Sequence, residues 1–129
     1  MEKHQYWRNS ADQWGIVSRI LHWTMALLII GMIIVGLYIN SLPDIPFKFL
    51  LIGLHKSTGV IILGLVVFRL FWRLSQSVPT LPPMPQTHQF LAKASVPVLY
   101  LFLFIMPISG IIMSQSFGYS ISVYGWFTF

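Results

Sequence analysis

Long apolar runs separated by short polar segments form the main pattern along this 129-residue chain. A transmembrane helix needs roughly 17–25 mostly apolar residues, and three segments meet that requirement: 20–39, 49–72 and 96–113. Pro97 and Pro107 fall in the third segment, where neighbouring helices can satisfy the carbonyl groups that prolines leave free. The pattern predicts an all-α, multi-pass transmembrane bundle with three spans that run up and down.

The segments between and after these spans differ in character. Residues 40–48 form a short loop, and residues 73–93 are rich in proline, which predicts an extended chain over the first half of that loop. Residues 114–129 carry no charge and contain Tyr119, Tyr124 and Trp126. Such a polar and aromatic tail is typical of the boundary between membrane and water.

Composition agrees with a membrane protein. Hydrophobic residues make up 56% of the chain and charged residues only 9%, against about 25% charged residues in an ordinary soluble domain. The chain has no cysteine, which excludes disulfides, thiolate ligands, cysteine nucleophiles and iron–sulfur clusters held by cysteine. The net charge of +5 comes from basic residues that flank apolar runs, so we expect them to orient the chain in a membrane and not to bind nucleic acid.

The basic residues gather on one side of the predicted spans. They precede the first span or flank the loop between the second and third: Lys3, Arg8, Arg19, Arg69, Arg73 and Lys93. The other side has Lys48 and, inside the second span, Lys56. The positive-inside rule therefore predicts a cytoplasmic N-terminus. The first apolar run is too long for a signal-peptide core, which predicts a retained anchor.

Two histidines lie within predicted spans, His22 in the first and His55 in the second. A buried imidazole is costly in hydrocarbon unless a partner occupies its nitrogens. The two spans run in opposite directions, which places the histidines roughly 15–20 Å apart in depth at 1.5 Å per residue. They cannot bind the same metal ion, so metal binding by both would require two sites, one near each membrane face.

Helical phase brings further residues to these two levels. Fourteen positions along a helix return to within about 40° of the starting direction. Gly36 therefore shares the face of His22 at the depth of His55. Arg69, fourteen residues after His55, and Arg73, eighteen residues after it, share the face of His55 at the depth of His22. A glycine admits a flat, bulky group, and an arginine binds a carboxylate through paired hydrogen bonds.

Haem b fits this pattern, because it is flat, carries two propionates and takes imidazole as an axial ligand. Gly59 lies one turn after His55, and Arg19 one turn before His22. The pattern predicts a haem near each face, with His22 and His55 as iron ligands. The glycines Gly36 and Gly59 would give clearance, and the propionate partners would come from Arg19, Arg69 and Arg73.

Structural roles also account for these residues. A histidine inside a span can be a hydrogen-bonded packing residue, an arginine at a span end can reach the interface, and glycines allow helices to pack closely. His4, in the polar N-terminal segment, and His88, in the proline-rich loop, are expected to be solvated. Lys56 is expected to be solvated or to attract an anionic group.

Four segments resemble the bacterial cytochrome b561 family, which is related to the b-type cytochrome subunits of nickel–iron hydrogenases. They are "RILHWTMALLIIGMIIVGLYI", "LHKSTGVIILGLVVFRLFWRL", "VLYLFLFIMPISGIIM" and "ISVYGWF", and they span about Trp14 to Phe127 in order. The "HW" pair, the "LHKSTG" start and the "FRLFWR" end of the second span are specific in combination. One departure is Val96, which stands where the third helix of the family often has a histidine.

The resemblance implies a four-helix bundle that binds two b haems and passes electrons between a quinol pool and another acceptor in the bacterial inner membrane. Its axial histidines come from the first, second and fourth helices. His22 matches the ligand of the first and His55 that of the second. The chain ends where the fourth helix would follow, so we expect residues 1–129 to form a single, C-terminally incomplete domain. The remaining ligands would come from a second copy, a partner chain or a downstream segment.

The leading hypothesis is therefore a membrane b-type cytochrome of a respiratory chain. The alternatives are a truncated, cofactor-free remnant and a small membrane anchor or assembly subunit in which both histidines only pack. Glu2, Asp12 and Asp44 all lie outside the spans, so acid–base catalysis within the membrane lacks carboxylates. Any enzymatic role would be electron transfer within a quinol-linked oxidoreductase.

Overall fold

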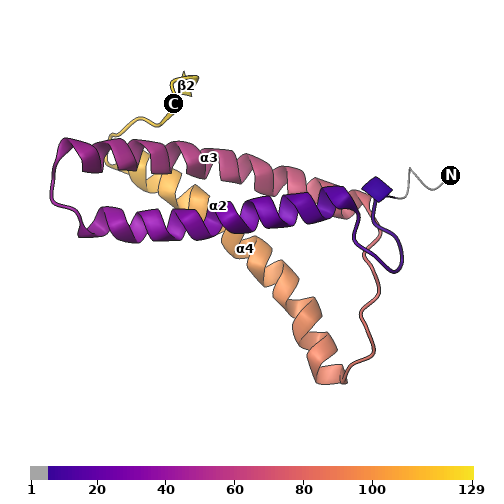
Figure 1. Cartoon of the computed structure of the whole chain (residues 1–129). Helices are drawn as coiled ribbons and strands as arrows, with labels where there is room; N and C mark the ends of the chain where they lie inside the picture. The colour runs from indigo at the N-terminus through magenta and orange to yellow at the C-terminus, as the bar shows by residue number, and fades with distance from the viewer. Residues whose placement is uncertain (1–5) are drawn as a thin grey trace.

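A computed structural model describes residues 6–129, so Lys3 and His4 lie outside the described residues. The elements, in chain order, are three long helices and a short hairpin: α2 (Ile16–Ser41), α3 (Pro46–Ser75), α4 (Gln86–Ser116), β1 (Ser122–Val123) and β2 (Phe127–Thr128). Figure 1 shows their arrangement. All three helices are long and apolar enough to cross a membrane, which confirms the predicted all-α, multi-pass fold.

Each helix is longer than the apolar span predicted for it, because polar residues at both ends of the span are also helical. α3 begins with Pro46, whose fixed φ suits a first helical turn. The proline-rich loop is shorter than predicted, because α4 begins at Gln86, directly after Pro85. His88 therefore lies in the first turn of α4 and not in a loop, which corrects that expectation, although its side chain is exposed as predicted.

α2 and α3 lie side by side and antiparallel (Figure 1). At one end the indole Nε1 of Trp72 donates to the Ser18 hydroxyl at 3.1 Å. In the middle of the pair Met25 is fully buried, together with Ile62 and Val66 of α3. These residues form the centre of the small apolar core. Most large apolar side chains of the helices are exposed, which suits surfaces that face lipid tails.

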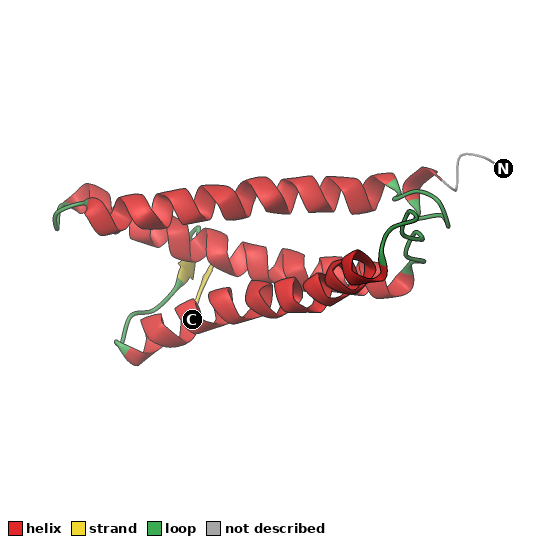
Figure 2. Cartoon of the chain, turned by 90° about the horizontal axis from the view of Figure 1, so that it is seen from below, coloured by secondary structure: helices red, strands yellow, loops and turns green. Residues whose placement is uncertain are grey.

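The backbone of α4 lies close to that of α3 and not to that of α2: no Cα atoms of α2 and α4 lie within 8 Å of one another. In Figure 1 the C-terminal half of α4 lies beside α3, and its N-terminal half diverges from both other helices. In Figure 2 the helices make up most of the molecule, and the hairpin lies toward the end opposite the N-terminus. α3 is thus the central helix, in contact with α2, α4 and the hairpin.

The C-terminal tail folds back as a β-hairpin on α3. Tyr124 (φ 51°) and Gly125 (φ 77°) both adopt positive φ, as a type I′ hairpin turn requires. The hydroxyl of Ser57 donates to the Ser122 carbonyl at 2.7 Å and accepts the Tyr124 N–H at 3.2 Å. The tail is aromatic and mostly exposed, as predicted, but its hairpin and its attachment to α3 were not predicted.

We predict that Ser57→Ala loosens this hairpin. Ser57 is buried, and its loss leaves the Ser122 carbonyl and the Tyr124 N–H without their partner, which costs about 1–3 kcal/mol. Hydrogen exchange of residues 119–129 should accelerate, and the thermal unfolding temperature should fall. Ser109→Ala is the matched control, because the Ser109 hydroxyl is exposed and bonds only within its own helix. Equal exchange in both variants would show that Ser57 does not anchor the tail.

Candidate functional site

His55 lies at the contact between α2 and α3, directly against Gly36. A Cβ atom built on Gly36 would lie 3.4 Å from Cε1 and 4.0 Å from Nε2 of the His55 ring. Nδ1 of this ring is buried and has no hydrogen-bond partner among the described residues. Since an unpaired polar atom is costly at membrane depth, His55 is the described histidine whose surroundings most favour an additional ligand.

The glycines lie where helical phase predicts. Gly36 is level with His55, and Gly59, one turn further along α3, faces Met32, whose Cε would lie 3.6 Å from an added Cβ. Both glycines therefore let a side chain of the opposite helix approach closely. At Gly36 this side chain is the His55 ring itself.

His22 lies fourteen residues from Gly36 on α2 and is more exposed than His55. Its ring stands edge-on to Trp23, with ring centroids 5.3 Å apart. Nη2 of Arg69 lies 2.9 Å from His22 Nδ1, so the structure brings together the two residues that helical phase places at one depth. A guanidinium can only donate hydrogen bonds, so Nδ1 accepts and a neutral ring has its proton on Nε2.

This proton position bears on iron binding. A nitrogen that coordinates iron must offer its lone pair, and Nε2 cannot do so while it carries the proton. Coordination by Nε2 of His22 would require the ring proton to lie on Nδ1, and Arg69 could then no longer donate to Nδ1. The guanidinium of Arg69 would be free to bind a carboxylate. The residues fit an axial imidazole and a propionate partner in that arrangement.

Arg69 lies where the three helices meet. Its Cζ is 6.0 Å from the centre of the Tyr100 ring of α4, and Nη1 approaches the Met25 sulfur at 4.0 Å. These contacts hold the guanidinium beside His22 from two sides. They also place Tyr100 at the level of His22, although no sequence signal had marked it.

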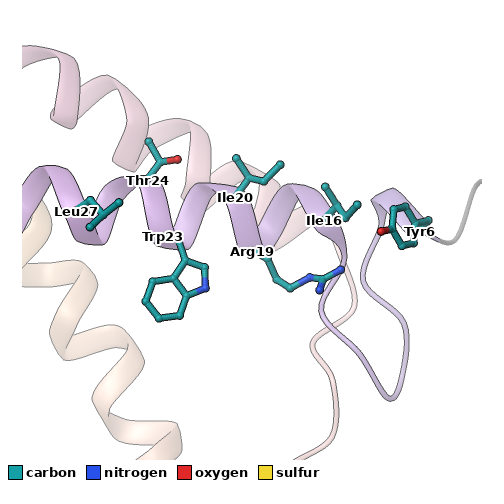
Figure 3. Close-up of a pocket in the computed structure, with 7 residues that line it drawn as sticks. All are labelled: Tyr6, Ile16, Arg19, Ile20, Trp23, Thr24 and Leu27. Atoms are coloured by element: carbon teal, nitrogen blue, oxygen red, sulfur yellow. The ribbon is translucent and has the colours of Figure 1, made fainter.

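The other two candidate arginines lie elsewhere. Cζ of Arg73 is 5.6 Å from the centre of the Trp14 ring. Arg19 is exposed and lines a hollow on another side of α2 together with Trp23 (Figure 3). Of the three arginines, Arg69 alone contacts a histidine among residues 6–129.

The two histidines lie at separate levels. The His22–Arg69 and Gly36–His55 contacts are fourteen residues apart along each helix, which is about 21 Å at 1.5 Å per residue. His88 precedes Tyr100 by twelve residues, which is about 18 Å along α4 from the level of His22. No three His, Cys, Asp or Glu side chains within the described part of the chain could hold a metal ion together.

A polar network at the start of α2 was missed from the sequence. The side-chain Oδ1 of Asn9 accepts hydrogen bonds from the Gly15 N–H at 2.9 Å and from the Ser18 hydroxyl at 2.6 Å. Asn9 thus satisfies donors at the N-terminus of the helix. Helix-start patterns describe residues next to the helix, and Asn9 lies seven positions before Ile16, so no local signal marks it.

Comparison with known proteins shows the family of this chain. A family model described as prokaryotic cytochrome b561 matches residues 13–129. The chain belongs to this family. Membership in a cytochrome family makes haem the group to seek at the two histidine levels and does not favour the cofactor-free remnant or the anchor subunit.

The chain is also similar to a curated protein named cytochrome b561 homolog 2, from Escherichia coli (strain K12). The two are 34% identical over 121 residues, which cover 92% of this chain and 64% of the relative. The chain therefore spans a little under two thirds of that protein's length. Together with the three membrane-spanning helices, family membership supports a bacterial membrane protein.

We predict that Gly36→Leu destabilises the α2–α3 contact, because the side chain would displace the His55 ring. Overpacking of this kind costs about 1–3 kcal/mol, so the thermal unfolding temperature in detergent should fall. Gly31→Leu is the control on the same helix, since an added Cβ there meets nothing within 4 Å. If the two variants unfold at the same temperature, Gly36 and His55 are not in contact.

Proposed function

We propose that this protein carries electrons between a quinol pool and another acceptor, with His22 and His55 each providing an axial imidazole to a b haem. When bound, haem b supplies a one-electron iron couple. The observation that carries the proposal is the presence of two histidine levels on the facing sides of α2 and α3. At one level the His55 ring, whose Nδ1 is buried and unpaired, has Cε1 and Nε2 against Gly36, and at the other His22 lies beside Arg69.

The residues around each histidine have distinct roles in this proposal. Gly36 and Gly59 have no side chain, so they leave room between α2 and α3 at the level of His55. With haem bound, Arg69 would leave Nδ1 of His22 and could hold a propionate, and Nδ1 would carry the ring proton. Arg73 lies one turn beyond Arg69, against Trp14, and is a further candidate for the propionates. Arg19, which faces the hollow on another side of α2, is the weakest of the three candidates.

We propose that each iron takes its second axial ligand from outside residues 6–129. His88 lies far along α4 from the level of His22 and is exposed. A second copy of the chain, a partner chain or a further segment would supply these ligands. The first measurement is the dithionite-reduced minus oxidised visible spectrum, with haem counted per polypeptide. A sharp low-spin spectrum would support a second strong ligand on each iron, and a high-spin spectrum would contradict it.

We also propose a cytoplasmic N-terminus. The basic side chains Arg8 and Arg19, before or early in α2, lie at the same end of the bundle as Arg73 of α3. The positive-inside rule assigns that end to the cytoplasm. In this orientation His55 lies toward the outer face, where we place the reaction with quinol.

Replacement of the histidines tests the haem proposal directly. His22→Ala and His55→Ala should each lower the haem content per polypeptide, and the double variant should lose haem almost completely, because each removes an iron ligand. His88→Ala is the control and should keep the haem content of the unmodified protein. Unchanged haem content in both single variants would refute the proposed ligands.

Arg69 should affect the redox potential of the haem near His22. Arg69→Gln removes a positive charge, which favours the oxidised iron and should lower the midpoint potential by about 30–60 mV, up to a tenfold change in equilibrium constant. Arg69→Lys keeps the charge and should restore most of the potential. A potentiometric titration measures both, and equal potentials for the Gln variant and the unmodified protein would exclude a charge contact.

A further inference from the structure

A groove lies at the beginning of α2, outside the proposed haem sites. Its larger part has a volume of about 530 Å³ and its smaller part about 220 Å³. Tyr6 and Arg19 line both parts, so the two adjoin. The larger part is completed by residues of the first three turns of α2 (Figure 3): Ile16, Ile20, Trp23, Thr24 and Leu27.

The groove opens on a side of α2 that does not face α3. Ser18 and Met25 mark the face toward α3. At 100° per residue, Arg19 lies about 100° from Ser18 around the helix, and Leu27 about 180° from it. α4 does not approach α2 either. Within residues 6–129 no helix covers the groove, which leaves this side of α2 open to lipid.

The polar end of the groove is positively charged. Arg19 lines both parts, and Arg8 lines the smaller one. No acidic residue lines either part, and the ion pair found among residues 6–129 joins Lys48 to Asp44. Asp12, in the same N-terminal segment, pairs with neither arginine. Two guanidinium groups without a carboxylate partner match the charge and the geometry of a phosphate.

The character of the groove changes along the helix axis. Arg19 and Trp23 project from the same side of α2, with Tyr6 near the charged end (Figure 3). From Arg19 to Leu27 the lining becomes apolar over eight residues, about 12 Å of helix. An indole between a cation and an apolar stretch is typical of the level of lipid headgroups.

We propose that this groove binds an anionic phospholipid. Arg8 and Arg19 hold the phosphate, Tyr6 and Trp23 flank the glycerol region, and one acyl chain lies along Ile20 and Leu27. The site is separate from the histidine levels and does not depend on haem. In this proposal Arg19 binds a lipid headgroup and not a haem propionate.

Native mass spectrometry of the purified, delipidated protein in detergent tests this site. Phosphatidylglycerol should bind more tightly than phosphatidylcholine, and inorganic phosphate should not displace it, because the acyl chain contributes to binding. A basic residue near a membrane surface contributes about 1 kcal/mol to the attraction of anionic lipid. Arg8→Gln and Arg19→Gln should therefore each weaken phosphatidylglycerol binding about fivefold.

Two further variants make the test specific. Lys93→Gln removes the same charge from an exposed position on α4 and should leave binding unchanged. Thr24→Trp fills the groove without a change of charge and should weaken binding of phosphatidylglycerol. The proposal would be overturned by any of three results. These are equal affinity for phosphatidylglycerol and phosphatidylcholine, a loss of phosphatidylglycerol binding in Lys93→Gln as large as in Arg8→Gln and Arg19→Gln, and displacement of the lipid by inorganic phosphate.

Discussion

The antiparallel register of α2 and α3 is the constraint on which the rest of the structure depends. The hydrogen bond from Trp72 to Ser18 aligns one end of the pair, and the contact of Gly36 with His55 aligns the other. Lipid tails are as apolar as the helices, so burial of apolar surface contributes little to helix association in a membrane. Close packing at glycines and a few interhelical hydrogen bonds must hold this register. A shift of one turn would separate His22 from Arg69 and His55 from Gly36 together.

Three consecutive polar residues of α3, Lys56, Ser57 and Thr58, contact the C-terminal segment. Ser57 and Thr58 both bond to the C-terminal hairpin, Ser57 through the backbone of β1 and Thr58 through the Tyr124 hydroxyl. The Lys56 amine lies 5.2 Å from the centre of the Tyr119 ring. A hydroxyl at membrane depth needs a partner. The Gly53 and Leu54 carbonyls of α3 lie within hydrogen-bond distance of the Ser57 and Thr58 hydroxyls, and the hairpin adds further partners. The tail thus satisfies polar groups of α3 only two to three residues from His55.

The sequence predicted those features that depend on local composition and on helical period. The three spans follow from apolar length, and the meeting of Arg69 with His22 follows from phase, because a helix repeats its directions regularly. The hairpin, by contrast, depends on a bond between Ser57 and Tyr124, sixty-seven residues apart. The side chains of Arg19 and Arg73 are long and can reach several partners, so phase alone did not place them. Arg73 instead lies over the ring of Trp14, from a segment without apolar periodicity.

The contact between Arg69 and His22 links charge to iron binding in the proposed cytochrome. An imidazole that coordinates through Nε2 has a proton on Nδ1, and that N–H cannot accept a hydrogen bond from a guanidinium. The observed contact and coordination through Nε2 are therefore alternatives, and the proposed binding of iron by His22 would require Arg69 to change partners. Tyr100 and Met25 confine the guanidinium to this level, so a carboxylate bound there would be close to the histidine. Removal of Arg69 should consequently alter both the affinity for haem and its potential, whereas a residue that only packs would alter stability alone.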